Sequence, residues 1–269
     1  MRIGCCGSMI SPATDATGIE VLEPLAALGF DYIELSLSDL TALSEEKFLE
    51  LAARLARCGL RCESCNNFFP SRVRLTGPEA RLSAALDHAG EALARAARLG
   101  VRVIVFGSSG AKNVPPGFPR EEAWRQIVNL LQLLGPLAER HGITIVIEPI
   151  SRPESNLVNR AADGLRLVRE VDHPSVQLLV DYYHLMTERE DPEIVLEART
   201  AIHHVHFAKV EGRAFPTQFE AAYARFFDYL RQIQYSGRCS IEAYTRDFAN
   251  DAPRALAVLR GLAGRIPVG

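Results

Sequence analysis

Short apolar runs recur along this chain and alternate with longer segments in which apolar residues have helical spacing. The clearest run, residues 101–107, is rich in Val and Ile, follows Gly100 and precedes the turn-forming sequence Ser108-Ser109-Gly110. A run with this composition and these boundaries is typical of a buried β-strand. The pattern predicts strands near residues 2–6, 31–36, 60–66, 101–107, 143–148, 176–181, 202–208 and 237–243.

The segments between these runs have the features of helices. Residues 82–99 are rich in Ala and Leu with Arg and Glu on one side, and residues 121–140 repeat apolar residues at intervals of three and four. Glycine is a common helix-ending residue, because it adopts the left-handed conformation without a steric penalty. Four glycines stand just before a predicted strand, where such an end is needed: Gly29, Gly59, Gly100 and Gly142.

Strands and helices that alternate in this way predict a parallel sheet. Eight such units in a chain of 269 residues favour one domain, a single (β/α)8 TIM barrel over residues 1–269. An open, doubly wound sheet is the alternative. No Gly-x-Gly-x-x-Gly motif follows the first predicted strand, which weakens the case for a dinucleotide-binding fold.

Composition and charge argue against several classes of protein. The net charge is -3 and the basic residues are scattered, so we expect no nucleic-acid partner. There is no signal peptide and no apolar span of about 18 residues, so we expect a cytoplasmic protein with no membrane partner. The six cysteines are expected to stay thiols. Cys62 and Cys65 form a C-x-x-C motif inside a predicted strand, which disfavours a redox or zinc role.

Four successive predicted strands end with a side chain that can bind a metal ion. A carboxylate at the end of a buried strand needs a partner, because an isolated buried charge is very unfavourable. In a barrel these strand ends would converge at one face. Three carboxylates and one imidazole form a mostly hard ligand set, which suits Mn²⁺, Mg²⁺ or Co²⁺ better than Zn²⁺. The four predicted ligands are Glu148, Asp181, His206 and Glu242. The pattern therefore predicts an enzyme with one divalent metal ion, with Mn²⁺ as the preferred ion.

Further residues lie at fixed distances from these four, and together they carry a resemblance to a known family. The chain resembles the xylose isomerase-like TIM-barrel superfamily, in particular its sugar phosphate isomerase/epimerase group, which includes ketose 3-epimerases and hydroxypyruvate isomerase. The motifs are Glu148-Pro149 with Glu154, Asp181-x-x-His184, His206 with Arg213, and Ile241-Glu242. Two features depart from these relatives. The hydroxypyruvate isomerases have Gln in place of His206, and Arg213 is not followed here by a loop rich in His and Gly.

The resemblance implies a role for each of these residues. Glu148, Asp181, His206 and Glu242 would bind the metal, and Glu148 and Glu242 would also act as acid and base on opposite faces of the substrate. The residues implied to bind substrate are Glu154, His184 and Arg213. The implied activity is a metal-dependent isomerase or epimerase of a small ketose, hydroxy-ketone or sugar derivative that works through an enediolate. The implied partners are a small sugar-like molecule and, in a homodimer or homotetramer, other copies of the chain.

Other functions remain open from the sequence. A dehydratase of an inosose or dehydroshikimate-type compound would use the same enolate chemistry. A hydrolase similar to endonuclease IV is disfavoured, because it needs many more His ligands than the seven His present here. A barrel that only binds a sugar is the non-enzymatic alternative. Alternation places His204 on the face of His206, where it lines the barrel or supports a ligand, and Glu34 either contacts substrate or holds a loop.

Overall fold

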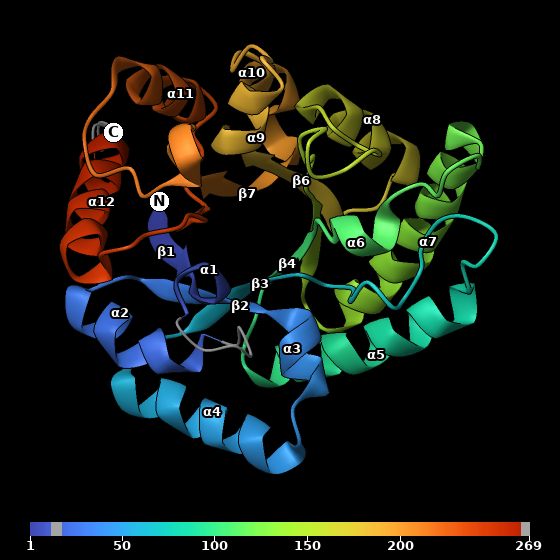
Figure 1. The fold of residues 1–269 in the computed structure, drawn as a ribbon, viewed down its shortest axis with the longest axis horizontal. Helices are drawn as coiled ribbons and strands as arrows, with labels where there is room; N and C mark the ends of the chain where they lie inside the picture. Colours follow the sequence, from blue (N-terminus) through green and yellow to red (C-terminus); the bar gives the residue numbers. More distant parts are fainter. Residues whose placement is uncertain (12–17, 265–269) are drawn as a thin grey trace.

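The computed structural model describes residues 1–11 and 18–264 and shows a closed barrel of parallel strands. Each strand pairs with the next along the chain, and β8 pairs with β1, which closes the barrel (Figure 1). The strands are β1 (Arg2–Cys6), β2 (Tyr32–Ser36), β3 (Cys62–Asn66), β4 (Val103–Phe106), β5 (Thr144–Ile147), β6 (Val176–Asp181), β7 (Ile202–Phe207) and β8 (Arg238–Ile241).

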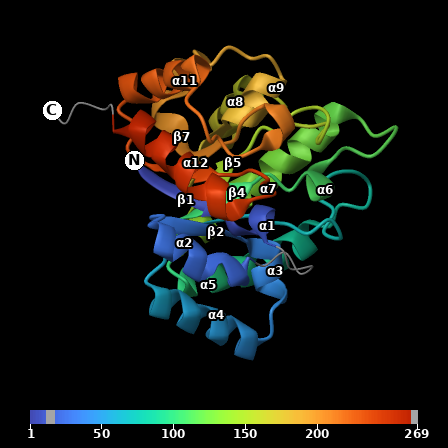
Figure 2. The same ribbon diagram turned by 60° about the vertical axis from the view of Figure 1, so that its left-hand side comes forward.

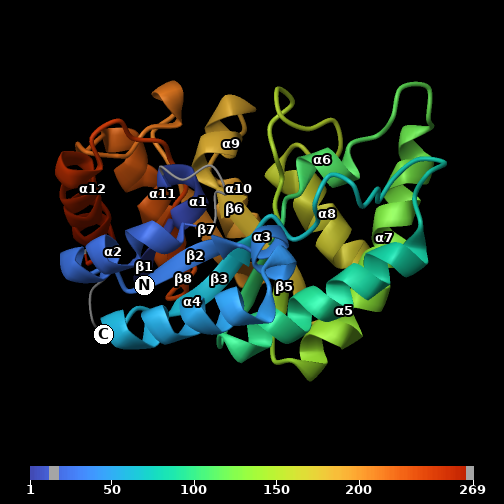
Figure 3. The ribbon, with the colours of Figure 1, turned by 60° about the horizontal axis from the view of Figure 1, so that its bottom comes forward.

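Helices surround the barrel, and neighbours pack against each other around the ring, as α2 does on α4 (Figure 2). Short helices such as α6 and α9 follow β4 and β6 directly and lie at the same end of the barrel (Figure 3). The helices are α1 (Gly7–Ile10), α2 (Leu22–Leu28), α3 (Leu37–Ala42), α4 (Glu45–Cys58), α5 (Leu82–Arg98), α6 (Ser109–Lys112), α7 (Arg120–Arg140), α8 (Ala161–Val171), α9 (Tyr182–Thr187), α10 (Ile194–Ala198), α11 (Ala221–Gln232) and α12 (Phe248–Ala263).

The predicted (β/α)8 barrel is confirmed, and the open sheet is wrong. Every predicted strand is present, with ends that differ by at most a few residues, and α5 and α7 lie where the helical spacing predicts them. Gly29, Gly59, Gly100 and Gly142 all have positive φ angles, as expected for left-handed helix ends. The prediction of one domain over residues 1–269 includes residues 12–17 and 265–269, which lie outside the described residues.

The barrel interior has an apolar side and a polar side. The main hydrophobic core lies between the strands and the surrounding helices, while Val103, Val105, Val146 and Leu179 form a separate apolar cluster. These four residues come from β4, β5 and β6 and alternate with residues of the main core, so they point into the barrel. The polar side is built by β2, β3, β7 and β8, whose hydrogen bonds cross the interior. This division places polar groups directly beneath the carboxyl ends of the strands.

Two expectations about the whole chain concern thiols and membranes. The cysteines are free, and the Sγ atoms of Cys62 and Cys65 are 3.8 Å apart within β3, which agrees with the expected thiols. Among the helices of the described residues, none has the length and apolar character that crossing a bilayer requires.

A glycine in β1 tests how tightly the interior is packed. A methyl group at Gly4 would overlap the buried ring of Tyr32, whose hydroxyl is held by Ser240. We therefore expect Gly4→Ala to lower the free energy of unfolding by about 1–3 kcal/mol, the usual cost of overpacking a core. Gly90→Ala in α5 is the control, because nothing lies within 4 Å of the added group and alanine favours helix. Urea unfolding of both variants measures the difference, and equal stabilities would contradict this account of the interior.

Candidate metal centre and active site

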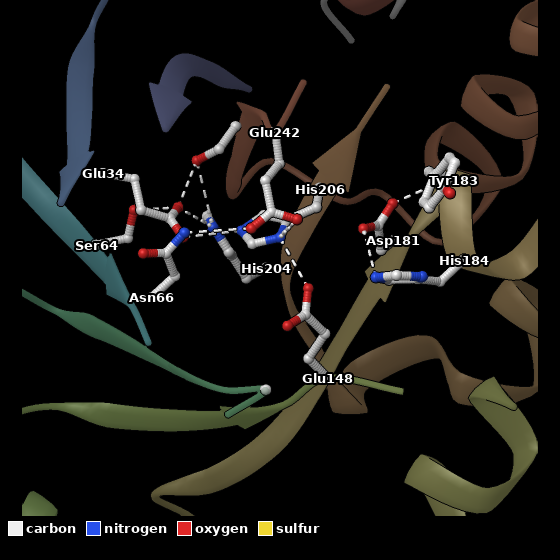
Figure 4. A network of polar contacts seen from close by, with 12 residues as sticks. Glu34, Ser64, Asn66, Glu148, Asp181, Tyr183, His184, His204, His206 and Glu242 are labelled. Atoms are coloured by element: carbon white, nitrogen blue, oxygen red, sulfur yellow. Dashed lines mark hydrogen bonds and ion pairs between the residues drawn. The ribbon is translucent and has the colours of Figure 1, made fainter. Parts of the chain in front are cut away.

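The four predicted metal ligands lie at the carboxyl ends of their strands and are all buried. Glu148 and Glu242 directly follow β5 and β8, Asp181 is the last residue of β6, and His206 is near the end of β7. Figure 4 shows their side chains converging from four strands. The fold therefore brings the predicted ligands together, while their role as ligands stays a prediction.

His206 lies at the centre of this arrangement. Its Nδ1 atom is 3.0 Å from Glu148 Oε1 and 3.2 Å from Glu242 Oε2, and its Nε2 atom is 2.9 Å from Glu34 Oε1. Burial alone would lower the pKa of His206, but the carboxylates of Glu242 and Glu34 raise it well above the usual value. If the ring is neutral and Nε2 donates to Glu34, the lone pair of Nδ1 faces two carboxylate oxygens. Such a site needs a cation, either a proton or a metal ion.

Asp181 supplies a further oxygen that has no hydrogen-bond donor. Its Oδ1 atom accepts a hydrogen bond of 2.7 Å from the backbone N–H of Tyr183, at the start of α9. Its Oδ2 atom is buried and has no hydrogen-bond partner among the described residues. Burial raises the pKa of Asp181, and the nearby charges of His184 and Arg213 oppose that effect. A buried carboxylate oxygen that accepts no hydrogen bond and lies beside the other carboxylates fits a divalent cation.

His184 also lies close enough to be a ligand, since its nearest atom and oxygens of Glu148, Asp181 and Glu242 all lie within 4.8 Å of one another. Its hydrogen bonds favour the predicted substrate contact instead. Nδ1 accepts a hydrogen bond of 3.3 Å from the backbone N–H of Ser151, so the proton of the neutral ring is on Nε2. Burial lowers the pKa of His184, which favours this neutral form. Nε2 is 3.6 Å from Asp181 Oδ2 and is available as a donor.

The other two predicted substrate residues form an ion pair beside the ligands. Arg213 Nη1 is 3.1 Å from Glu154 Oε2, while Nη2 contacts Glu242 and is 3.7 Å from Asp181 Oδ2. The guanidinium also lies 4.8 Å from the ring centre of Tyr183. Burial alone would lower the pKa of Arg213, but the surrounding carboxylates, Glu242 first, raise it. Arg213 therefore stays a fixed positive charge that links the predicted ligands to the more exposed Glu154.

The two predicted acid/base residues have opposite electrostatic surroundings. Burial and the charge of Glu242 raise the pKa of Glu148. Burial would also raise the pKa of Glu242, but His206 and Arg213 hold it well below its usual value. Two carboxyl groups with pKa values moved in opposite directions can divide into an acid and a base. Glu148 also lies against the backbone of Gly107, where any larger residue would overlap its carboxylate.

Asn66, Glu34 and His204 also belong to the site, and the sequence did not fix a single role for any of them. Asn66 Nδ2 donates a hydrogen bond of 3.2 Å to Glu242 Oε1, and its Oδ1 atom is buried without a partner among the described residues. His204 lines the barrel interior, which is one of its two predicted positions, and bonds to Glu34 below His206. Glu34 is buried inside the barrel and does not hold a loop. The signal in the sequence is alternation: polar and apolar residues alternate in 64–66, 204–207 and 239–242, as expected when one face of a strand lines a polar interior.

Comparison with known proteins identifies the family. The sequence matches the family described as xylose isomerase-like TIM barrel over residues 22–262. The chain belongs to this family. It is 25% identical over 253 residues to L-ribulose 3-epimerase of Mesorhizobium japonicum, covering 93% of this chain and 84% of that protein. It is 24% identical over 270 residues to ketose 3-epimerase of Arthrobacter globiformis, covering 97% and 90% of the two chains.

Solved structures show the same fold. A crystal structure of D-psicose 3-epimerase in the presence of D-fructose aligns over 98% of this chain and 100% of that chain, with a TM-score of 0.87 and 21% identity. The predicted family resemblance is confirmed by these matches. The prediction that the chain is an enzyme is also confirmed, since relatives matched over most of both chains are sugar epimerases.

Lys112 beside the site gives a pH-dependent prediction. It is fully buried, its Nζ donates to the carbonyl of Gly107, and burial lowers its pKa to about 8 despite the nearby charge of Glu148. Between about 8 and the usual 10.5 the unfolded chain binds more protons than the folded chain, so this residue makes stability rise with pH there. The shift corresponds to on the order of 3 kcal/mol.

We expect Lys112→Met to remove this rise. Chemical unfolding of the wild-type chain and the variant at about pH 7.5 and about pH 10.5 should show that the variant's stability relative to wild type falls as pH increases. The difference between the two chains isolates Lys112 from the tyrosines and cysteines that also titrate in this range. A stability difference that does not change with pH would contradict the buried, proton-losing lysine.

Proposed function

We propose that this chain is a metal-dependent epimerase or isomerase that acts on a small ketose, hydroxy-ketone or sugar derivative. The observation that carries the proposal is the convergence of buried lone pairs from Glu148, Asp181, His206 and Glu242 at the carboxyl ends of four neighbouring strands. The names of the relatives, L-ribulose 3-epimerase and ketose 3-epimerase, support the substrate class.

These four residues are the proposed metal ligands. Three carboxylates and one imidazole favour Mn²⁺, with Mg²⁺, Co²⁺ or Zn²⁺ as alternatives. A bound divalent ion would polarise the substrate's carbonyl and neighbouring hydroxyl, which makes the adjacent C–H bond more acidic. His184 remains the alternative fourth ligand by distance, but its proton on Nε2 favours a contact with a substrate oxygen.

Glu242 and Glu148 are the proposed base and acid. Glu242 is held in its ionised form by His206 and Arg213, so it suits removal of a proton from the carbon next to the carbonyl. Glu148 has a raised pKa and suits return of a proton. If they act on opposite faces of the same carbon, the centre is inverted and the chain is an epimerase. If the proton returns to the neighbouring carbon, the chain is an aldose–ketose isomerase.

The remaining residues would hold the substrate. His184 would donate a hydrogen bond from Nε2 to a substrate oxygen, and Asn66 Oδ1 offers a buried acceptor for a hydroxyl. Arg213 and Glu154 would bind the far end of the substrate, because their ion pair lies where the site becomes exposed. Arg213 presents planar, charge-assisted donors that suit hydroxyl, carboxylate or phosphate oxygens.

The central test is proton exchange. The protein should be purified without chelator, analysed for metal, and incubated with a panel of ketoses in D₂O. We expect one divalent ion per chain and deuterium incorporation next to the carbonyl, lost after chelation and restored by Mn²⁺. Absence of both metal and exchange would contradict the proposed function.

The proposed acid/base pair gives a second prediction. Glu148→Gln and Glu242→Gln should each lower the exchange rate by at least about 10²-fold, because an amide cannot accept or return the proton. Glu190→Gln is the matched control: its buried carboxylate accepts hydrogen bonds from the backbone of Ala161 and Ala162, outside the proposed ligand group. Circular dichroism checks the fold of all three variants. Full activity of either site variant would remove its acid/base role.

Arg213 gives a third prediction. Arg213→Ala should raise KM for the ketose that exchanges best, while the metal content is retained. The expected factor corresponds to a loss of roughly 1.5–3 kcal/mol of binding free energy, which is typical of a charge-assisted hydrogen bond. Arg225→Ala, which removes an exposed arginine paired with Asp191, should leave KM unchanged. An unchanged KM in Arg213→Ala would count against substrate binding by this residue.

A further inference from the structure

We propose that Glu34 is a positioning residue for the metal centre: it holds Nε2 of His206 and thereby presents the lone pair of Nδ1 to the ion. The inference rests on the proposed metal-dependent function. Glu34 itself is not a proposed ligand, since it lies on the opposite side of the His206 ring from Glu148 and Glu242 (Figure 4).

Both oxygens of Glu34 are fixed by donors from other strands. Oε1 is 2.9 Å from His206 Nε2. Oε2 is 2.8 Å from His204 Nε2, and it accepts hydrogen bonds of 2.7 Å from Ser64 Oγ and 2.6 Å from Ser240 Oγ. Ser64 is on β3, which pairs with β2, while His204, His206 and Ser240 are on β7 and β8, which do not. The carboxylate of Glu34 is therefore held both by the neighbouring strand and by strands that are not its neighbours in the sheet.

This network is sealed from solvent. Glu34, His204 and His206 are each 0% exposed, which matters because an ionised carboxylate in such surroundings is stable only when donors satisfy it. Beneath them lies the ring of Tyr32, whose hydroxyl is 2.8 Å from Ser240 Oγ. Gly4 leaves space for that ring, since any side chain there would overlap it. A rotation of the Glu34 side chain would break its bonds to His204, His206 and the two serines, and the packed surroundings offer no space for another position.

The bonds of the two histidines define where their protons lie. His204 Nδ1 is buried without a partner among the described residues, so the proton of the neutral ring is on Nε2 and faces Glu34. His206 donates to Glu34 in the same way, which leaves Nδ1 unprotonated towards Glu148 and Glu242 when a metal replaces the proton there. A carboxylate that holds the second nitrogen of a histidine ligand typically changes metal affinity by about 10–100-fold.

The test measures Mn²⁺ affinity, not activity alone. Glu34→Gln keeps the shape of the side chain. It replaces the two acceptor oxygens of a carboxylate with one neutral amide oxygen and an NH₂ group that can only donate. We expect the Mn²⁺ dissociation constant of metal-stripped Glu34→Gln, measured by calorimetric titration, to rise by about 10–100-fold. The matched control is Glu63→Gln. Glu63 is a buried carboxylate on the same β3 strand as Ser64, but it pairs with Arg2 and Arg238, each at 2.7 Å, away from His206.

The outcomes separate this inference from the proposed function. Weaker Mn²⁺ binding in Glu34→Gln but not in Glu63→Gln supports the positioning role. Equal affinities in the wild-type chain, Glu34→Gln and Glu63→Gln overturn it and leave the metal function intact. Failure of the wild-type chain to bind Mn²⁺ overturns the proposed function, and this inference with it.

A second measurement needs no substitution and decides the matter if Glu34→Gln does not fold. Nitrogen-15 NMR of the wild-type chain loaded with diamagnetic Zn²⁺ reports which nitrogen of His206 carries the proton. We expect a protonated Nε2 with a chemical shift typical of a hydrogen bond to a carboxylate, and a Nδ1 shift that moves on addition of Zn²⁺. Protonation at Nδ1 in the Zn²⁺-loaded protein would overturn the inference.

Discussion

Negative charge buried at one end of the barrel is the constraint on which the whole site depends. Glu34, Glu148, Asp181 and Glu242 are all removed from water and come from β2, β5, β6 and β8 or the residues that follow them. Like charges gathered in a poorly polar interior are unfavourable unless cations or hydrogen-bond donors compensate them. His206 lies among three of the four carboxylates, and Arg213 contacts two. Most other features of the site follow from this need for compensation.

The contrast between His184 and His206 shows how hydrogen bonding assigns chemistry to identical side chains. Both rings are buried next to carboxylates. For His184, the backbone N–H of Ser151 donates to the lone pair of Nδ1. For His206, the Glu34 carboxylate accepts a hydrogen bond from Nε2, which leaves the lone pair of Nδ1 available. One ring is therefore suited to donate and the other to coordinate. Proximity alone groups His184 with the three carboxylates, and only the partner atoms distinguish the two roles.

The sequence predicts the barrel and the strand ends well, for a physical reason. Strands of a closed parallel barrel are buried on both faces, so a charged residue at the end of an apolar run is conspicuous. That is how Glu148, Asp181 and Glu242 can be found without a structure. The role of Glu34 cannot be found this way, because its partner His204 is 170 residues away and on a strand that is not its neighbour in the sheet. The contact exists only because the barrel closes.

The two sides of the barrel interior also differ in how they would tolerate change. Val103, Val105, Val146 and Leu179 make contacts without directional bonds, and apolar clusters of this kind accept exchanges that conserve total volume. On the side of Glu34, Ser64, Ser240 and Nε2 of His204 each bond to its carboxylate, so a substitution at any one of them removes a partner from a buried charge. Volume-conserving substitutions should therefore cost less stability in the apolar cluster of β4, β5 and β6 than substitutions in the polar network around Glu34.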